Sequence, residues 1–231
     1  MEIGAQFGRV VCDRGAGVRN VFFLVADKNM EAMIKGFFSR TAFHRTLGCG
    51  PFVFEPHQDL LVAHGLNDPG LFTRANELLQ PFVRTHAHAV VMLDSDWEGS
   101  PGADAIKKRI DAHLISAGWT GDTSCSVVIH PELESWVWQD SPHVHSVLGC
   151  KESYMELQKV LEAQGFWGAG ASKPHRPKEA VEWVLRRAKI SRSSAMYQQL
   201  SAVVTTKRCS DSSFLALTAA LQRWFPSTLT G

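Results

Sequence analysis

The sequence predicts an α/β fold in which a mostly parallel sheet is flanked by helices, with a C-terminal helical extension. Short apolar runs rich in β-branched residues alternate with segments whose apolar residues recur at helical spacing, and this alternation favours parallel strands joined by helices. The last third of the chain carries helical patterns only. We therefore expect an α/β core over residues 1–150 and a helical extension over residues 151–231 that packs on it as one compact unit.

The first strand is expected at residues 20–26, where β-branched and aromatic residues follow one another. A helix should follow over residues 30–40, because its apolar residues recur at helical spacing and Asp27 or Asn29 can cap its start. This start of the chain therefore predicts a strand, a short polar turn and a helix.

The next segment is less regular. Residues 51–55 predict a second strand, and residues 60–64 predict a strand or a helix turn. The glycines and proline of residues 65–70 should break the chain there, and a helix is expected over residues 71–83.

The central strand is expected at residues 89–94, because a continuous apolar run suits a strand that is covered on both faces. A helix over residues 103–116 and another buried strand at residues 125–129 follow. A proline at residue 131 is typical of a first helical position, so a helix is expected to open there. Four later helices are expected, at residues 151–163, 177–189, 194–203 and 210–225.

Acidic residues stand where the central strand ends. Asp94, Asp96 and Glu98 are spaced two apart, so in an extended chain their side chains point the same way. They are hard oxygen ligands of the kind that Mg²⁺ or Mn²⁺ prefers, and ligands of open α/β sheets bind at the carboxyl ends of the strands. An acidic, solvated turn that caps the next helix explains the same residues without a metal.

Two further acidic pairs follow predicted strands. Asp27 and Glu31 come after the first strand, and Glu132 and Glu134 come after the last one. Because the carboxyl ends of parallel strands meet at one edge, the three groups together have the layout of a carboxylate site for divalent cations, where metal ions support phosphoryl transfer.

Composition and charge narrow the class of protein. The formal charge is −6 up to residue 170 and +7 after it, which fits a cation site beside a phosphate-binding surface and equally two parts that attract each other. No run approaches the roughly 20 apolar residues needed to cross a bilayer, so we expect a cytoplasmic protein without membrane contact. Five widely spaced cysteines without a CxxC pair predict neither disulfides nor structural zinc.

Basic residues gather in and around one predicted helix near the C-terminus. If they bind DNA or RNA, their contacts should be to phosphates, whereas a solvated helix face is the plainer explanation. The candidates for nucleic-acid binding are Lys173, Arg176, Lys178, Arg186, Arg187 and Arg208.

Histidines give a competing metal site. The His86-x-His88 pattern can chelate zinc, but it should lie at the opposite end of its strand from Asp94. Histidines that are exposed or hydrogen-bonded in the core are the alternative.

Several short motifs resemble the Toprim (Toprim/Rossmann-like) superfamily. Leu93-Asp94-Ser95-Asp96 matches its DxD motif, and Glu134-Ser135-Trp136 is similar to the Glu-x-Trp of the small stand-alone Toprim-like proteins of bacterial phage-defence loci. Residues 177–179 and 209–214 are similar to the C-terminal helical signatures of those small proteins. The resemblance covers residues 20–225.

The resemblance implies a component of a bacterial antiviral defence system, acting as a Mg²⁺- or Mn²⁺-dependent nuclease on nucleic-acid phosphodiesters. Asp94, Asp96 and Glu134 would be the metal ligands, with Glu134 also assisting catalysis. Asp27 would serve as base or ligand, and Lys178 or Arg208 would steady a phosphate. The implied partners are other proteins of the defence system and DNA or RNA.

One position departs from the family pattern. The first strand of Toprim proteins usually ends in Val-Glu-Gly, and here the corresponding residues are Val25, Ala26 and Asp27. Asp27 can substitute only from one position further along, with a shorter side chain. The sequence therefore also supports an alternative, a catalytically degenerate subunit that binds a partner defence protein or nucleic acid.

Overall fold

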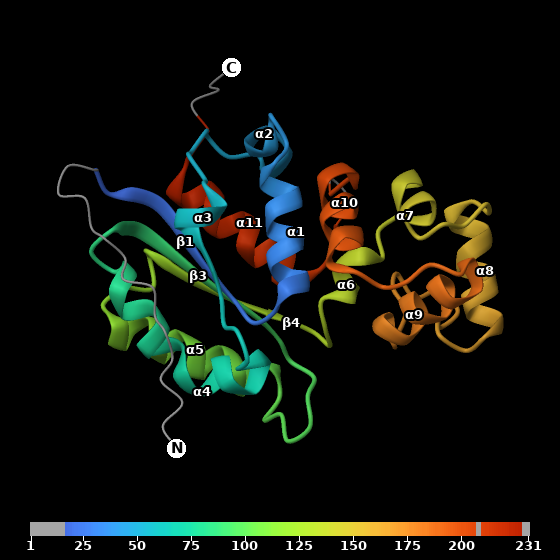
Figure 1. Ribbon diagram of the computed structural model, residues 1–231, viewed down its shortest axis with the longest axis horizontal. Helices are drawn as coiled ribbons and strands as arrows, with labels where there is room; N and C mark the ends of the chain where they lie inside the picture. The colour runs from blue at the N-terminus through green and yellow to red at the C-terminus, as the bar shows by residue number, and fades with distance from the viewer. Residues whose placement is uncertain (1–16, 207–208, 228–231) are drawn as a thin grey trace.

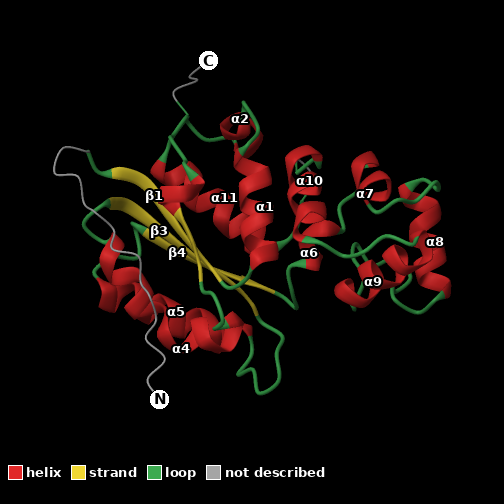
Figure 2. Cartoon of the chain, in the orientation of Figure 1, coloured by secondary structure: helices red, strands yellow, loops and turns green. Residues whose placement is uncertain are grey.

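The sheet has four parallel strands in the order β2-β1-β3-β4. In the computed structural model, which describes residues 17–206 and 209–227, the strands are β1 (Arg19–Val25), β2 (Leu60–Val62), β3 (His86–Asp94) and β4 (Ser124–Ile129). Helices flank this sheet, and further helices follow toward the C-terminus (Figures 1 and 2). The predicted α/β class is confirmed.

The two central strands form the middle of the core. Val21 through Val25 of β1 and Ala89 through Leu93 of β3 are all fully buried. A strand covered on both faces has no polar side, which is why these two segments read as continuous apolar runs. The register pairs Val25 with Met92, so the carboxyl ends of β1 and β3 lie side by side.

Helices cover the two faces of the sheet (Figure 1). On one face lie α1 (Lys28–Phe38) and α11 (Ser212–Trp224), and on the other lie α4 (Asn67–Leu79) and α5 (Ala103–Ala117). The chain passes from β1 to β2 in one direction and then crosses back to β3, so the strand order reverses between β1 and β3. In open α/β sheets, ligands bind at the carboxyl ends of the strands beside such a reversal.

The helical extension divides into two parts. α8 (Tyr154–Ala163) and α9 (Pro177–Ala188) lie beyond the end of the sheet, whereas α10 (Ser194–Val203) packs along α1 (Figure 1). α1 and α10 approach closely at Gly36, where an added Cβ would stand 2.1 Å from the carbonyl oxygen of Gln198. The extension is therefore not a separate layer, since α10 and α11 return to the core.

Short elements complete the described chain. They are α2 (Phe43–Leu47), α3 (Pro56–Asp59), η1 (Gln80–Phe82), α6 (Glu134–Val137) and α7 (Pro142–Val147). In the described residues, no helix combines the length and the apolar character required to cross a membrane.

Two element predictions were wrong. Residues 51–55 form no strand, although Phe52 is buried; the backbone N–H of Val53 donates to the side chain of Asn20 at 2.9 Å instead of to a strand. The helix expected to open at residue 131 begins only at Glu134 and spans four residues. The carbonyl of Pro131 accepts hydrogen bonds from Ser95 and Asp96, so the chain there is held against the end of β3.

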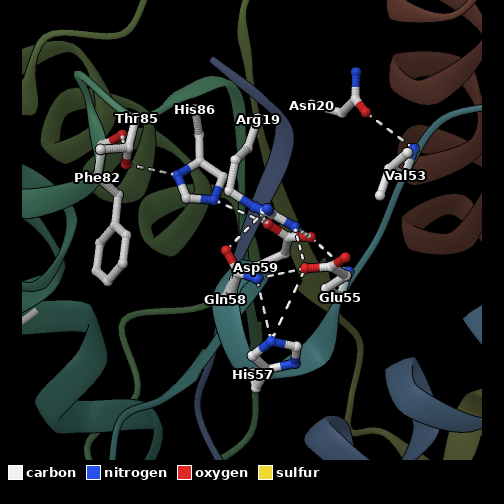
Figure 3. A network of polar contacts seen from close by, with 10 residues as sticks. All are labelled: Arg19, Asn20, Val53, Glu55, His57, Gln58, Asp59, Phe82, Thr85 and His86. Carbon is white, nitrogen blue, oxygen red and sulfur yellow. Dashed lines mark hydrogen bonds and ion pairs between the residues drawn. The ribbon is translucent and has the colours of Figure 1, made fainter. Parts of the chain in front are cut away.

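A network of paired charges closes the amino edge of the sheet (Figure 3). Asp59, just before β2, is fully buried and accepts hydrogen bonds from the guanidinium of Arg19 and from Nε2 of His86, the latter at 3.1 Å. The backbone N–H of Glu55 donates to the same carboxylate at 2.6 Å. Burial alone would raise the pKa of Asp59, but these donors outweigh it and hold that pKa below its ordinary value.

Candidate functional site

Every strand of the sheet leads into an acidic residue at the carboxyl edge. Asp27 follows β1, Asp68 lies in the first turn of α4 after β2, and Asp94 is the last residue of β3. Glu132 and Glu134 follow β4. The charges of Asp27, Asp68 and both glutamates all act on the carboxyl group of Asp94, so parallel topology has gathered residues from four separate segments.

Asp94 is at the centre of this acidic cluster, which we define as Asp27, Asp68, Asp94, Glu132 and Glu134. Its Oδ1 is buried and has no hydrogen-bond partner within the described part of the chain. Burial raises the pKa of Asp94 well above its ordinary value, and the charge of Asp68, followed by that of Glu134, raises it further. A cation bound at this carboxyl group would favour its ionised form and oppose the rise in pKa.

Asp68 is a member of the cluster that sequence reasoning missed. Its Oδ1 accepts the backbone N–H of Asp94 at 2.8 Å, which ties the start of α4 to the end of β3. Burial raises the pKa of Asp68, and the charge of Asp27 adds to the effect. The position of Asp68 just after residues 60–64 could have indicated its place in the cluster. The sequence, however, did not decide whether residues 60–64 form a strand or a helix turn.

Asp27 caps α1. Its Oδ1 accepts the backbone N–H groups of Asn29 at 2.7 Å and of Met30 at 2.8 Å, as predicted for an N-cap. Asp27 also lines a cleft of about 380 Å³ at the carboxyl ends of β1 and β2, together with Ala26 and His64. Ala26 is 1% exposed and contributes only a methyl group to this cleft.

Glu134 is held by two donors from the C-terminal helices. Its Oε1 accepts hydrogen bonds from the hydroxyl of Tyr197 and from the guanidinium of Arg192, and its side chain is 2% exposed. Burial and the charge of Glu134 raise the pKa of Tyr197, so the hydroxyl stays protonated and donates. These contacts join α6 to α10 and occupy one oxygen of the predicted metal ligand.

Glu132 brings Lys178 to the cluster. Its Oε1 accepts the backbone N–H of Lys178 at 3.0 Å, and its Oε2 lies 3.8 Å from the ammonium of the same residue. Burial raises the pKa of Glu132 to about 7, and the charge of Glu134 adds to this rise. The charge of Lys178 also acts on Asp68, so this predicted catalytic residue does lie at the acidic edge.

Asp96 does not share the burial of Asp94. It is exposed, and its backbone N–H donates to the carbonyl of Pro131 at 3.0 Å. The intervening Ser95 is buried and its hydroxyl is 2.8 Å from Nδ1 of His130. The chain therefore leaves the sheet immediately after Asp94, and only the first acid of the DxD motif is enclosed. As predicted, His86 and His88 lie at the other end of β3.

The other predicted nucleic-acid contacts are dispersed. Lys173 pairs with Asp211 at 2.9 Å, Arg187 pairs with Glu152, and the guanidinium of Arg176 lies over the ring of Phe166. Arg186 is exposed in the last turn of α9. Arg208 lies outside the described residues. Of this group, Lys178 is the residue that the structure brings to the acidic cluster.

The donor chemistry of the cluster suits a hard divalent cation. Carboxylate oxygens are the ligands that Mg²⁺ and Mn²⁺ prefer, and the unpartnered Oδ1 of Asp94 together with the raised pKa values of Asp94 and Asp68 are what a cation would relieve. As the side chains stand, no three His, Cys, Asp or Glu residues in the described ranges form a group that could hold a metal ion. The residues therefore fit by chemistry and position, and binding requires the carboxylates to draw together.

Comparison with known proteins adds no family. No family model matches the chain, and neither a curated protein nor a solved structure matches it significantly.

Proposed function

We propose that this protein is a Mg²⁺- or Mn²⁺-dependent phosphodiesterase that cleaves DNA or RNA in the cytoplasm as part of a bacterial anti-phage defence system. The observation that carries the proposal is the buried, unpartnered Oδ1 of Asp94 among four other carboxylates at the carboxyl edge of the sheet. The resemblance to Toprim-like proteins supports the defence setting, with other proteins of that system as partners.

Roles for the residues follow from their contacts. Asp94 and Asp68, which a hydrogen bond already links, are the first candidates to hold the cation, and Asp27 offers Oδ2 because Oδ1 caps α1. A bound cation would activate water and stabilise the leaving oxygen of the phosphodiester. Lys178, whose ammonium lies 3.8 Å from Oε2 of Glu132, would hold a phosphate oxygen, and Arg192 and Tyr197 fix the orientation of Glu134.

The test is a cleavage assay on single- and double-stranded DNA and RNA with Mg²⁺ or Mn²⁺. We expect cleavage by the full chain and none by the Asp94→Asn variant, because the amide cannot supply an anionic ligand. The matched control is Asp104→Asn, which removes an exposed acid from the first turn of α5. If Asp94→Asn cleaves as fast as the parent protein, the catalytic proposal fails.

A second candidate is a catalytically degenerate subunit that binds a partner defence protein or nucleic acid. Two observations favour it: the methyl group of Ala26 replaces the usual glutamate, and one oxygen of Glu134 is taken by Arg192 and Tyr197. This candidate predicts no cleavage with either metal, and retention of labelled DNA or RNA, or of a partner protein, that Asp94→Asn leaves unchanged. Cleavage that depends on Asp94 rejects it.

A further inference from the structure

The outer edge of β4 has no partner strand in the described chain, and the carbonyl of Ser126 accepts only a weak hydrogen bond from the thiol of Cys125, at 3.8 Å. β4 pairs with β3 on one side only, and the order places no strand beyond it in the described chain. The carbonyls of Thr123 and Ile129 accept N–H groups from the β3 side at 3.0 and 2.9 Å. Because backbone groups alternate along a strand, the N–H and C=O groups of Ser124, Ser126 and Val128 point away from β3.

A groove of about 440 Å³ runs along this edge. Its two walls come from helices that lie on opposite faces of the sheet, α5 and α11 (Figure 1). The walls and floor include Lys107, Asp111 and Ile115 of α5, Ala216, Ala219 and Arg223 of α11, and Ser124, Cys125 and Ser126 of β4.

The groove has the form of a strand-sized slot. Ala216 and Ala219 are exposed on α11 and leave the space beside β4 unfilled, and an added strand would lie roughly 4.8 Å from β4. The edge is recessed, since Ser124 and Ser126 are 9% and 4% exposed. A second copy of the chain therefore cannot pair through its own β4, which lies at the bottom of the same slot.

The rims of the groove are chemically different. Arg223 donates to the carbonyl of Gly121 at 3.2 Å and pairs with no carboxylate in the described ranges, whereas Lys107 is paired with Asp111 at 2.8 Å. On the α5 side, Ile115 is 62% exposed. Within the described residues, the groove thus offers a cation without a carboxylate partner on one wall and an apolar side chain on the other.

We propose that this groove binds an extended peptide segment of a partner protein as a fifth strand of the sheet. The main chain of the peptide would pair with Ser124, Ser126 and Val128. Alternate side chains would face the two walls, small residues and one carboxylate toward α11 and Arg223, and apolar residues toward Ile115. Main-chain pairing supplies affinity and the alternating contacts supply selectivity in this mode of recognition. The site is separate from the acidic cluster, so it stands or fails independently of the catalytic proposal.

The probe is a set of fluorescein-labelled octapeptides in which valine and alanine alternate and one glutamate is moved through the positions. Anisotropy should show saturable binding to the full chain by some members, with Kd below about 500 μM. Arg223→Glu should weaken that binding about tenfold, and peptides with lysine in place of glutamate should regain it on this variant. Peptide binding should also slow hydrogen exchange at the backbone amides of Ser126 and Val128.

Two tryptophan variants form the matched pair. Ala219→Trp fills the groove and should abolish peptide binding, whereas Ala105→Trp makes the same change at an exposed position of α5 outside the groove and should not. Circular dichroism establishes that both are folded. The proposal is overturned if no peptide binds with a Kd below about 500 μM, or if Ala219→Trp binds the peptides as well as the parent. It is also overturned if light scattering shows a dimer that Ala219→Trp dissociates, because a second copy then fills the groove.

Discussion

At the amino edge of the sheet, Asp59 is fully buried, yet three donors satisfy its carboxylate and keep it ionised. At the carboxyl edge, Asp94 is enclosed by other acids, and its Oδ1 has no partner in the described chain. The pKa of Asp59 is lowered and that of Asp94 is raised, although both residues lie at strand ends. The difference separates a charge that stabilises the fold from one that destabilises it.

Buried carboxylates that repel one another are retained where something outside the fold can compensate them. The amino edge needs nothing further, because Arg19 and His86 complete it. The carboxyl edge is incomplete in this sense, and it lies where the strand order reverses. We therefore expect the amino edge to contribute to stability and the carboxyl edge to bind a ligand, and mutations can test each edge separately.

Asp59→Ala should have the largest effect on stability. It leaves Arg19 and His86 without their shared acceptor, and breaking such a buried pair costs about 3 to 5 kcal/mol. Urea denaturation at pH 7 measures the loss. Asp104→Ala, at an exposed acid, should change the free energy of unfolding by less than about 0.5 kcal/mol. Equal losses in the two variants would contradict the assigned role of the amino edge.

The free energy of unfolding should depend on pH through the protonation of Glu132. Its folded pKa is about 7, above the ordinary value of 4.5, so the folded state binds the proton more tightly. Its contribution to the unfolding free energy is therefore fully present below pH 4.5 and is lost as pH rises through 7, by roughly 3 kcal/mol. Glu132→Gln should flatten this part of the curve, measured by urea denaturation at several pH values. The assignment would be rejected if the unfolding free energy of the parent rose between pH 4.5 and 7 and Glu132→Gln gave the same curve.

Asp94→Asn should stabilise the protein by about 1 kcal/mol at pH 8, because the amide removes the repulsion from neighbouring carboxylates. The gain should shrink at pH 5, where protonation removes the same charge. Thermal unfolding at the two pH values measures it. Destabilisation at pH 8 would mean that the carboxylate of Asp94 is compensated within the fold.

Mg²⁺ should have the smallest effect. At a concentration equal to its Kd, a cation that binds only the folded state adds about 0.4 kcal/mol. Thermal unfolding with and without Mg²⁺ should show this gain in the parent and lose it in Asp94→Asn, while Asp59→Asn keeps it. A gain that survives in Asp94→Asn would place the cation elsewhere.

The sequence predicts those elements whose pattern has a single explanation. The strands predicted from the apolar runs of β1 and β3 are confirmed, and so is the helix cap at Asp27. Burial on both faces requires continuous apolar residues, and helix capping requires a particular polar residue, so both can be predicted from the sequence. The strand expected at residues 51–55 was wrong because aromatic and β-branched residues suit a buried loop as well as a strand, and here the backbone N–H of Val53 donates to the side chain of Asn20.

The composition of the site depends on contacts that no local pattern records. Asp68 was missed because β2 has only three residues, and only the sheet order shows that its end adjoins β1. The two donors that hold Glu134, Arg192 and Tyr197, are about 60 residues away in the chain. The predicted roles of Asp27, Asp94 and Lys178 remain predictions, now with a shared location.

The close contact at Gly36 has a consequence for how the site tolerates change. Any side chain there would meet Gln198 and Ser201, with the added Cβ 2.1 Å from the carbonyl oxygen of Gln198, and would push α10 away from α1. Because α10 carries Tyr197, this shift would also withdraw the hydroxyl that holds Glu134. Gly36 has no functional group of its own, yet substitutions there would alter the acidic edge from a distance. Random mutagenesis should therefore find Gly36 as intolerant of substitution as the acids themselves.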